Sequence, residues 1–281
     1  MTVTGSTQRT ASGSLFLGVR GAQLAYSVHG SGPLVLRAHG LSSSRAAEAR
    51  VPLFDFSAVE ASGFRVAAYD ARGHGESEGG SLPSDYAWSA LADDMLALGA
   101  ALSPDQPFTG IGLSMGTATL LYAALRAPER FNALVLTAAP TAWETRAERA
   151  QIHEERARFL EEHSYADVIA LYEDGVPAPI FEPLDAAPSM PDVDLRLLPA
   201  VLRGAGMSDL PDREELRSLR MPVLILAWAT DEAHPVSTAE QLAQLIPGSI
   251  LHVSETLDDI RTWGARTAEF LSGLQISSRV H

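Results

Sequence analysis

Ser114 is the residue of this sequence best placed to act as a nucleophile, because it is the centre of a Gly-Leu-Ser-Met-Gly motif at positions 112–116. The motif follows an apolar run typical of a strand, 107–113, and leads into an apolar run typical of a helix, 117–125. A turn of this kind between a strand and a helix projects the serine hydroxyl clear of the sheet, at a helix N-terminus that favours negative charge. A Cβ atom at either glycine would collide with neighbouring backbone. We therefore expect Ser114 to be a nucleophile rather than a serine in an ordinary glycine-rich turn.

The rest of the chain predicts the framework that such a turn needs. We expect strands over 14–19, 23–28, 34–37, 65–70, 107–113, 132–137, 222–229 and 249–254. The first two form an antiparallel pair, and the later ones alternate with runs of helical spacing at 85–102, 117–125 and 237–245. Such alternation predicts a mostly parallel sheet covered by helices on both faces.

The alternation pauses after residue 141, and no segment from there to about residue 219 has a convincing strand pattern. Residues 145–162 are dense in Glu and Arg and predict an exposed helix, and 177–191 is rich in Pro. We interpret this stretch as a helical insertion. The chain then has three parts: 1–140 as the first part of a core, 141–215 as the insertion and 216–281 as the second part of the core.

Four motifs, taken in chain order, resemble those of the α/β-hydrolase superfamily. They are His39-Gly40 after the third strand, Tyr-Asp-Ala-Arg-Gly-His-Gly-Glu-Ser at 69–77, the Ser114 motif, and Ala-Thr-Asp-Glu-Ala-His-Pro at 229–235. The resemblance covers nearly all of the chain and implies an α/β-hydrolase fold, with a mostly parallel eight-stranded sheet flanked by helices. The insertion lies where this superfamily carries a helical cap. The pattern as a whole is similar to that of small capped esterases, lactonases and perhydrolases.

This resemblance also implies roles for individual residues. The backbone N–H groups of Met115 and Leu41 would form the oxyanion hole, and Asp231, at the end of the strand 222–229, would be the acid. A serine also needs a histidine as its base, normally held by a carboxylate. The superfamily places that histidine after the last strand, but residues 257–260 are Leu-Asp-Asp-Ile.

We therefore predict that the base has moved to His234, in the loop after the strand 222–229, because this loop borders the expected position of Ser114. Its carboxylate partner is Asp231, three residues earlier, or else Asp258 or Asp259, in the loop that lacks the histidine. Such an exchange between loops is acceptable because a triad is defined by its geometry and not by its order in the chain. Asp258 and Asp259 also fit a simpler role as N-caps of the last helix.

Other histidines leave alternatives open. His252 is the alternative base, but it lies inside the last strand, where its side chain is expected to pack between helix and sheet. The resemblance implies that His39 and His74 stabilise turns. A chain with no functional base would be a binding protein that keeps the fold but has lost catalysis.

Composition restricts the remaining functions. The net charge is −14, which argues against nucleic acid as a partner. All 21 basic residues are Arg, which we attribute to genomic base composition. There is no Cys, so disulfides and thiolate metal sites are excluded, and the eight histidines show no metal-binding spacing. No signal peptide, membrane helix or cofactor motif is visible. We expect a cytoplasmic protein without metal or organic cofactor and leave homo-oligomer formation open.

These observations predict a serine hydrolase that cleaves a small or medium ester or lactone. We expect an uncharged or hydrophobic acyl group, in an apolar pocket supplied by the insertion. Candidate lining residues are Phe159, Leu160, Ile169, Leu171, Ile180 and Phe181. A perhydrolase, an acyltransferase or a C–C hydrolase would share the acyl-enzyme step and stays an alternative, whereas Ser114 argues against enzymes of this fold that use an Asp nucleophile.

Overall fold

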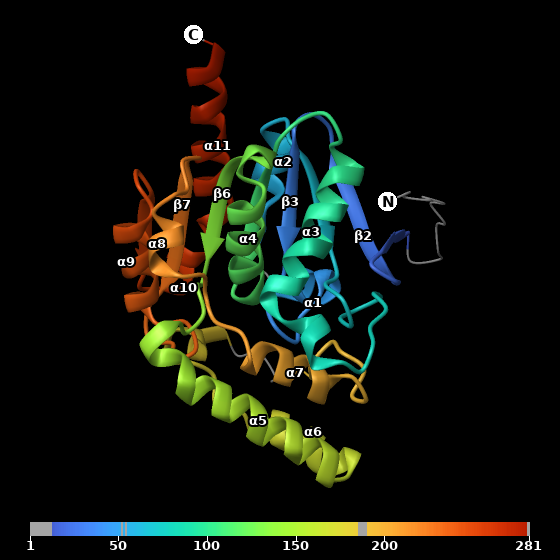
Figure 1. Ribbon diagram of the computed structural model, residues 1–281. Helices are drawn as coiled ribbons and strands as arrows, with labels where there is room; N and C mark the ends of the chain where they lie inside the picture. The colour runs from blue at the N-terminus through green and yellow to red at the C-terminus, as the bar shows by residue number, and fades with distance from the viewer. Residues whose placement is uncertain (1–12, 52, 54, 185–189, 280–281) are drawn as a thin grey trace.

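The eight apolar runs form one sheet in the computed structural model, which describes residues 13–51, 53, 55–184 and 190–279 (Figure 1). The strands are β1 Leu15–Val19, β2 Ala22–Gly30, β3 Leu34–Ala38, β4 Arg65–Tyr69, β5 Phe108–Leu113, β6 Phe131–Thr137, β7 Val223–Trp228 and β8 Ile250–Ser254. Their order is β1-β2-β4-β3-β5-β6-β7-β8. β2 pairs antiparallel with β1 and β4, and all other pairs are parallel. The predicted α/β-hydrolase architecture is therefore confirmed.

The register brings the carboxyl ends of the central strands to one edge of the sheet. Ala38 of β3 lies beside Gly112 of β5, Leu113 lies beside Thr137 of β6, and Thr137 lies beside Leu226 of β7. The loops that follow these strands therefore leave the sheet side by side. Ligands of open α/β sheets bind at this edge, outside the carboxyl ends of the strands.

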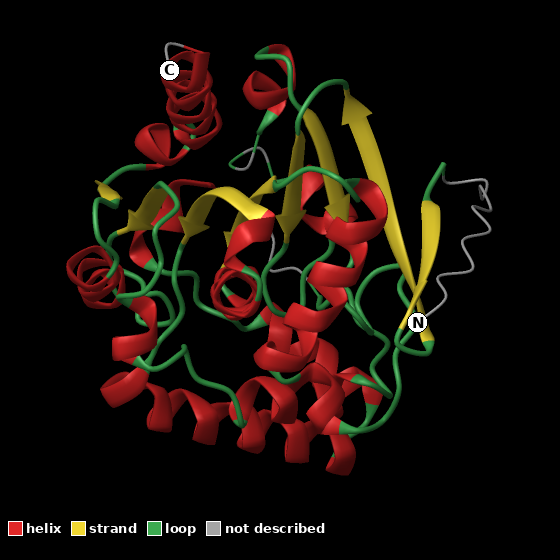
Figure 2. Cartoon of the chain, turned by 45° about the horizontal axis from the view of Figure 1, so that its top comes forward, coloured by secondary structure: helices red, strands yellow, loops and turns green. Residues whose placement is uncertain are grey.

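Helices cover both faces of the sheet (Figure 2). The helices on one face are α3 Trp88–Leu102, α4 Met115–Arg126 and α9 Val236–Leu245, and on the other they are α2 Ser57–Ala61, α10 Leu257–Ile260 and α11 Trp263–Arg279. Side chains alternate between the two cores, as the strand period requires. Leu34 and Leu36 of β3 belong to the first core, and Val35 between them belongs to the second.

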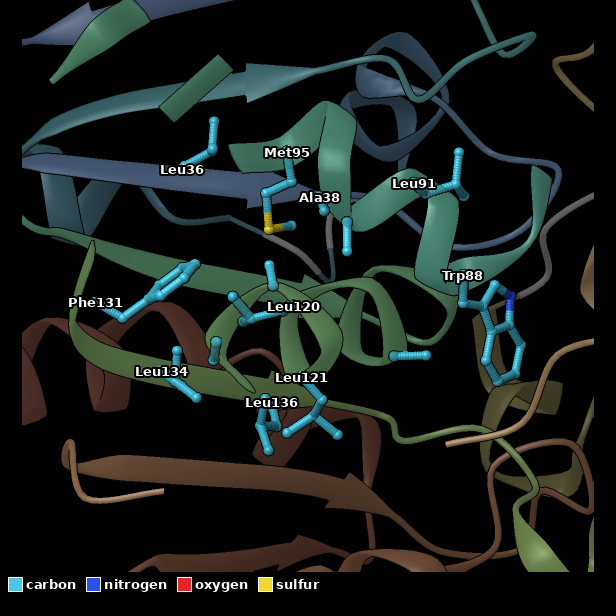
Figure 3. Close-up of a cluster of buried hydrophobic side chains, with 14 of the residues drawn as sticks. Leu36, Ala38, Trp88, Leu91, Met95, Leu120, Leu121, Phe131, Leu134 and Leu136 are labelled. Atoms are coloured by element: carbon cyan, nitrogen blue, oxygen red, sulfur yellow. The ribbon is translucent and has the colours of Figure 1, made fainter. Parts of the chain in front are cut away.

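The first core fills the space between α3, α4 and the sheet (Figure 3). Met95 of α3 and Leu120 of α4 meet Leu36 and Leu134 there, and all four are fully buried. α3 begins later than the helical spacing predicts, because Pro83–Tyr86 form a separate 3-10 turn. The backbone N–H of Trp88, in the first turn of α3, donates to Ser208 Oγ at 3.0 Å and so ties α3 to the insertion.

The inserted segment lies across the carboxyl ends of the strands (Figure 1). Its helices are α5 Arg146–Glu162, α6 Tyr165–Glu173, α7 Leu198–Gly206 and α8 Arg213–Leu216, with 3-10 turns at Trp143–Thr145 and Pro179–Leu184. Between β6 and β7 the described residues form no strand. Ala157 of α5 packs against Val201 and Leu202 of α7. The boundaries 141 and 215 stay a prediction.

The remaining elements are short: α1 Arg45–Arg50 follows β3, and a 3-10 turn, Pro128–Arg130, precedes β6. In the part of the chain that the structure describes, no helix has the length and apolar character needed to cross a membrane.

Candidate active site

Ser114 lies in a strained turn between β5 and α4. Its backbone has φ 52° and ψ −108°, in the positive-φ region that side chains other than Gly rarely adopt. A Cβ atom on Gly112 would be 2.3 Å from Gly116 O, and one on Gly116 would be 2.3 Å from Ala38 O. The Ser114 N–H donates to Thr137 O at 3.0 Å. Both glycines are therefore required by close backbone contact, which is the reason given for them from the sequence.

His234 connects the serine to a carboxylate. Its Nε2 lies 2.8 Å from Ser114 Oγ, and its Nδ1 lies 2.7 Å from Asp231 Oδ2. Because a carboxylate only accepts hydrogen bonds, Nδ1 carries the proton, and Nε2 is left to accept the proton of the serine hydroxyl. The structure thus brings together Ser114, His234 and Asp231, in the arrangement that a serine nucleophile requires.

Asp231 is held as a carboxylate by three donors. Besides His234, it accepts from the indole N–H of Trp228 at 2.9 Å and from the Ala233 N–H at 2.8 Å. Burial raises the pKa of Asp231, but these hydrogen bonds and the charge of His234 outweigh it and lower the pKa to about 2. The side chain is therefore ionised at neutral pH and can orient His234.

Trp228 is a site residue that the sequence analysis missed. Its ring meets the His234 ring edge-on, with centroids 5.3 Å apart, and stacks on Trp263 at 5.3 Å. The signal available in the sequence was an indole at the end of a buried strand, three residues before the expected acid. Trp228 thus connects the second core of the sheet to the orientation of both His234 and Asp231.

The alternative base and acids lie elsewhere. His252 Nε2 is 2.8 Å from Asp259 Oδ2, and His252 does not line the cavity that contains Ser114. Asp259 also pairs with Arg266 at 3.0 Å, and Asp258 pairs with Arg261 at 2.6 Å.

Asp258 and Asp259 do not have the simpler structural role expected of them. The N-cap of α10 is Thr256, whose Oγ1 accepts from the Asp259 N–H at 3.3 Å. Both aspartates lie in the first turn of the helix, where negative charge is favourable, rather than at the cap itself.

His39 and His74 are buried turn residues. His39 Nε2 accepts from the Ala71 N–H at 2.8 Å, and its Nδ1 donates to Gly40 O at 2.7 Å. His74 Nδ1 donates to Arg72 O at 2.8 Å. Neither ring lines the cavity at Ser114.

The two residues expected to supply the oxyanion hole, Leu41 and Met115, line the same cavity as Ser114. Met115 is the first residue of α4, so its N–H has no acceptor within the helix. Leu41 follows Gly40, and a Cβ atom on Gly40 would be 3.6 Å from Ser114 Cβ.

That cavity has a volume of about 490 Å³ and lies between the sheet edge and the insertion. Its apolar wall includes Leu53, Leu113, Phe181 and Trp228. Of the six lining residues predicted from the sequence, only Phe181 belongs to this wall. Ile180, for example, points into the second core instead. The prediction failed because helical spacing marks an apolar face without saying whether it meets the core or a cavity.

The opposite wall carries basic side chains, so the cavity combines the expected apolar lining with a charged region that the sequence did not predict. Arg146, Arg149, His153 and Arg156 of α5 line it. A larger hollow of about 840 Å³ opens at the other end of the sheet, and none of Ser114, His234 and Asp231 lines it. Among the described residues no three His, Asp or Glu side chains are grouped as metal ligands would be.

Comparisons with known proteins identify the family to which this fold belongs. Residues 33–256 match the model of a family described as the alpha/beta hydrolase fold. The 3-oxoadipate enol-lactonase 2 of Acinetobacter baylyi is 28% identical over 200 residues, which are 68% of this chain and 70% of that relative. A hydrolase from Pseudomonas aeruginosa PA01 has a TM-score of 0.74 at 25% identity, with 93% of this chain and 99% of that chain covered. The enol-lactonase from Burkholderia xenovorans LB400 shares the fold, with a TM-score of 0.71 at 23% identity and coverage of 92% and 99%.

Proposed function

Because the chain belongs to the α/β-hydrolase fold family, we propose that it is a serine hydrolase that cleaves a carboxylic ester or a lactone through an acyl-enzyme on Ser114. The observation that carries the proposal is the 2.8 Å contact between His234 Nε2 and Ser114 Oγ, together with the 2.7 Å contact between His234 Nδ1 and Asp231. A nucleophile, its base and the group that orients the base form the arrangement that this chemistry needs.

The reaction begins with the serine proton. His234 Nε2 takes this proton as Ser114 Oγ attacks the carbonyl carbon, and the Leu41 and Met115 N–H groups stabilise the oxyanion that forms. Asp231 holds the imidazolium through Nδ1. The bond to the leaving oxygen then breaks as His234 returns the proton to it, which releases an alcohol or opens the lactone.

The second half of the reaction uses water. His234 accepts a proton from a water molecule as its oxygen attacks the acyl-enzyme carbonyl. The bond to Ser114 Oγ then breaks, the serine regains its proton from His234 and the carboxylic acid leaves. The segment 141–215 acts as a cap in this scheme, because its residues line one side of the cavity that contains Ser114.

Turnover and labelling test the nucleophile. We expect the protein to hydrolyse short-chain p-nitrophenyl esters or a small lactone, and Ser114→Ala to lose about a thousandfold or more of kcat/KM. A fluorophosphonate should add covalently to Ser114 in the wild type, located by peptide mass spectrometry, and should not label Ser114→Ala. A folded wild-type protein that neither turns over these substrates nor reacts with the probe would instead be a binding protein on this fold.

A further inference from the structure

The inward face of α5 forms a basic wall opposite the proposed nucleophile. Arg146, Arg149, His153 and Arg156 follow one another at intervals of three, four and three residues, so they lie on one face of the helix. All four line the cavity that contains Ser114 and His234. We refer to Arg146, Arg149, His153 and Arg156 as the basic wall.

Arg146 is a buried charge with no carboxylate in contact among the described residues. It is 5% exposed, donates through Nε to Ser208 O at 2.6 Å and also donates to Ala205 O, and stacks over Trp88 at 4.2 Å. Burial lowers the pKa of Arg146 to about 10, so the group is still charged at neutral pH. The charge of Asp209 acts on Arg146 without contacting it. A buried cation with no carboxylate in contact is costly, and a ligand that supplies a negative charge would offset that cost.

Other arginines of the insertion are paired, which makes the basic wall distinctive. Arg158 pairs with Glu154 at 3.0 Å, Arg203 pairs with Glu154 and Glu161, and Arg213 pairs with Glu144. Within the described residues, Arg149 and Arg156 make no ion pair, although α5 is rich in Glu.

The charged residues that line the cavity are basic, in contrast to the acidic chain as a whole. The protein has 35 acidic and 21 basic residues, yet the described lining residues include three Arg and two His and no Asp or Glu. The guanidinium groups of Arg146, Arg149 and Arg156 lie close enough to His153 for their charges to act on its ring. After burial itself, their charges are the cause that lowers the pKa of His153, to about 3, so that the ring is neutral.

We propose that the substrate is an ester or lactone that carries a carboxylate, and that this carboxylate binds the basic wall while the reacting carbonyl lies at Ser114. This inference rests on the proposed hydrolase function and specifies its substrate class. Nε and Nη2 of Arg146 already bind carbonyl oxygens of the protein, so Arg146 contributes mainly charge. Arg149 and Arg156 keep their planar donor groups for a carboxylate, which matches a guanidinium in a bidentate arrangement.

Matched substrates measure the preference directly. One series is p-nitrophenyl hydrogen succinate, glutarate and adipate, each compared with the neutral ester in which an isopropyl group replaces the carboxylate. A second pair puts the charge on the alcohol, comparing the butyrate ester of 4-hydroxybutyrate with 4-methylpentyl butyrate in a pH-stat. We expect kcat/KM for at least one charged substrate to exceed that of its neutral partner about tenfold or more.

The variants Arg149→Gln and Arg156→Gln locate the effect, and Arg158→Gln is the matched control, because it removes the same charge from the same helix outside the cavity. Each wall variant should raise KM for the charged substrate about ten- to hundredfold and leave the neutral substrate within about twofold. Arg158→Gln should change neither. Arg146 is left intact because it also holds α7 and Trp88 in place.

The outcomes separate the two proposals. If neutral esters are hydrolysed in a Ser114-dependent way but no charged substrate is preferred, the basic wall does not select carboxylates and only this inference fails. Equal losses in Arg158→Gln and the wall variants would also overturn it, because the effect would then come from the overall charge. If neither substrate class is hydrolysed, the hydrolase proposal itself fails.

Discussion

Trp228 and Asp231 show how one hydrogen bond between neighbouring residues can set the state of the proposed base. The indole N–H is one of three donors that keep the carboxylate ionised, and the same ring lies edge-on to His234. The carboxylate in turn fixes which nitrogen of His234 carries the proton. Changes to these partners should therefore affect kcat more than KM.

Removing the carboxylate charge should nearly abolish turnover. Asp231→Asn keeps the size of the side chain, but its amide can donate to His234 and favour the wrong tautomer. We expect kcat to fall about a thousand- to ten-thousandfold with little change in KM. Steady-state kinetics with a p-nitrophenyl ester measure this, and a loss below about tenfold would contradict the role of Asp231.

Removing the indole donor should have a smaller effect. Trp228→Phe keeps an aromatic ring but loses one of the three hydrogen bonds that hold Asp231, so the carboxylate should orient His234 less firmly. We expect kcat to fall about three- to tenfold. Trp143→Phe is the control, because its indole N–H donates to Pro211 O outside the site. A kcat equal to that of the wild type in Trp228→Phe, or an equal loss in Trp143→Phe, would show that this hydrogen bond does not orient the proposed base.

Single residues differed in how well the sequence could predict them. Ser114 could be predicted because its conformation is set locally, by two glycines that no larger residue could replace. His234 could be proposed because the loop after β7 must lie near the loop after β5. The role of Trp228 was not predicted, because an indole at the end of a strand does not by itself indicate a hydrogen bond to Asp231, which depends on side-chain rotamers.

At the scale of elements, the turn from β5 into α4 depends on close backbone approach. Gly116→Ala would place a Cβ atom 2.3 Å from Ala38 O, so we expect it to lower the free energy of unfolding by about 3 kcal/mol or more, or to prevent folding. Gly273→Ala in α11 is the control, because among the described residues no atom outside the backbone of its own helix lies within 4 Å of the added Cβ, and it should stabilise the helix by up to about 1 kcal/mol. Urea unfolding measures both, and a Gly116→Ala protein as stable as the wild type would contradict the packing described.

The strands and the insertion were predicted with different success. The strands lie within one or two residues of their predicted positions because apolar runs bounded by turns mark buried strands well. α5 was expected to be exposed, yet Arg146, His153 and Ala157 are buried. Composition could not show this, because a charged helix face can meet either water or a cavity, and tertiary packing alone decides between them.

At the scale of the whole molecule, the strand order explains how the base can change loops. In the sheet the strands follow one another in the order β5, β6, β7, β8. The loop after β7 therefore lies one strand closer to Ser114, which follows β5, than the loop after β8 does. A histidine from the β7 loop therefore reaches the serine, and the β8 loop is left to form α10.

Two buried histidines should make the fold sensitive to mild acid. Burial, and then the charge of His39, lower the pKa of His74 to about 3, and burial with the three wall arginines lowers that of His153 to about 3. In the unfolded chain both imidazole rings take up a proton near pH 6.5, whereas in the folded protein they stay neutral down to about pH 3. The two neutral rings therefore contribute fully to stability above pH 6.5, and this contribution is lost as the pH falls towards 3.

The slope of stability with pH measures this effect. We expect the free energy of unfolding to fall by up to about 2.7 kcal/mol between pH 6 and 5, which is about 1.4 kcal/mol for each histidine. His153→Gln should remove about half of that slope. Urea unfolding at the two pH values tests it, and an unchanged slope in His153→Gln would show that His153 is not buried in the neutral form.

The most direct test of the account compares two histidines in one assay: hydrolysis of a short-chain p-nitrophenyl ester by His234→Ala and by His252→Ala. His234 Nε2 lies 2.8 Å from Ser114 Oγ, whereas His252 pairs with Asp259. We predict that His234→Ala loses about a thousandfold or more of kcat/KM and that His252→Ala stays within a few-fold of the wild type. Full activity in a folded His234→Ala protein, or an equal loss in His252→Ala, would contradict the assignment of the base.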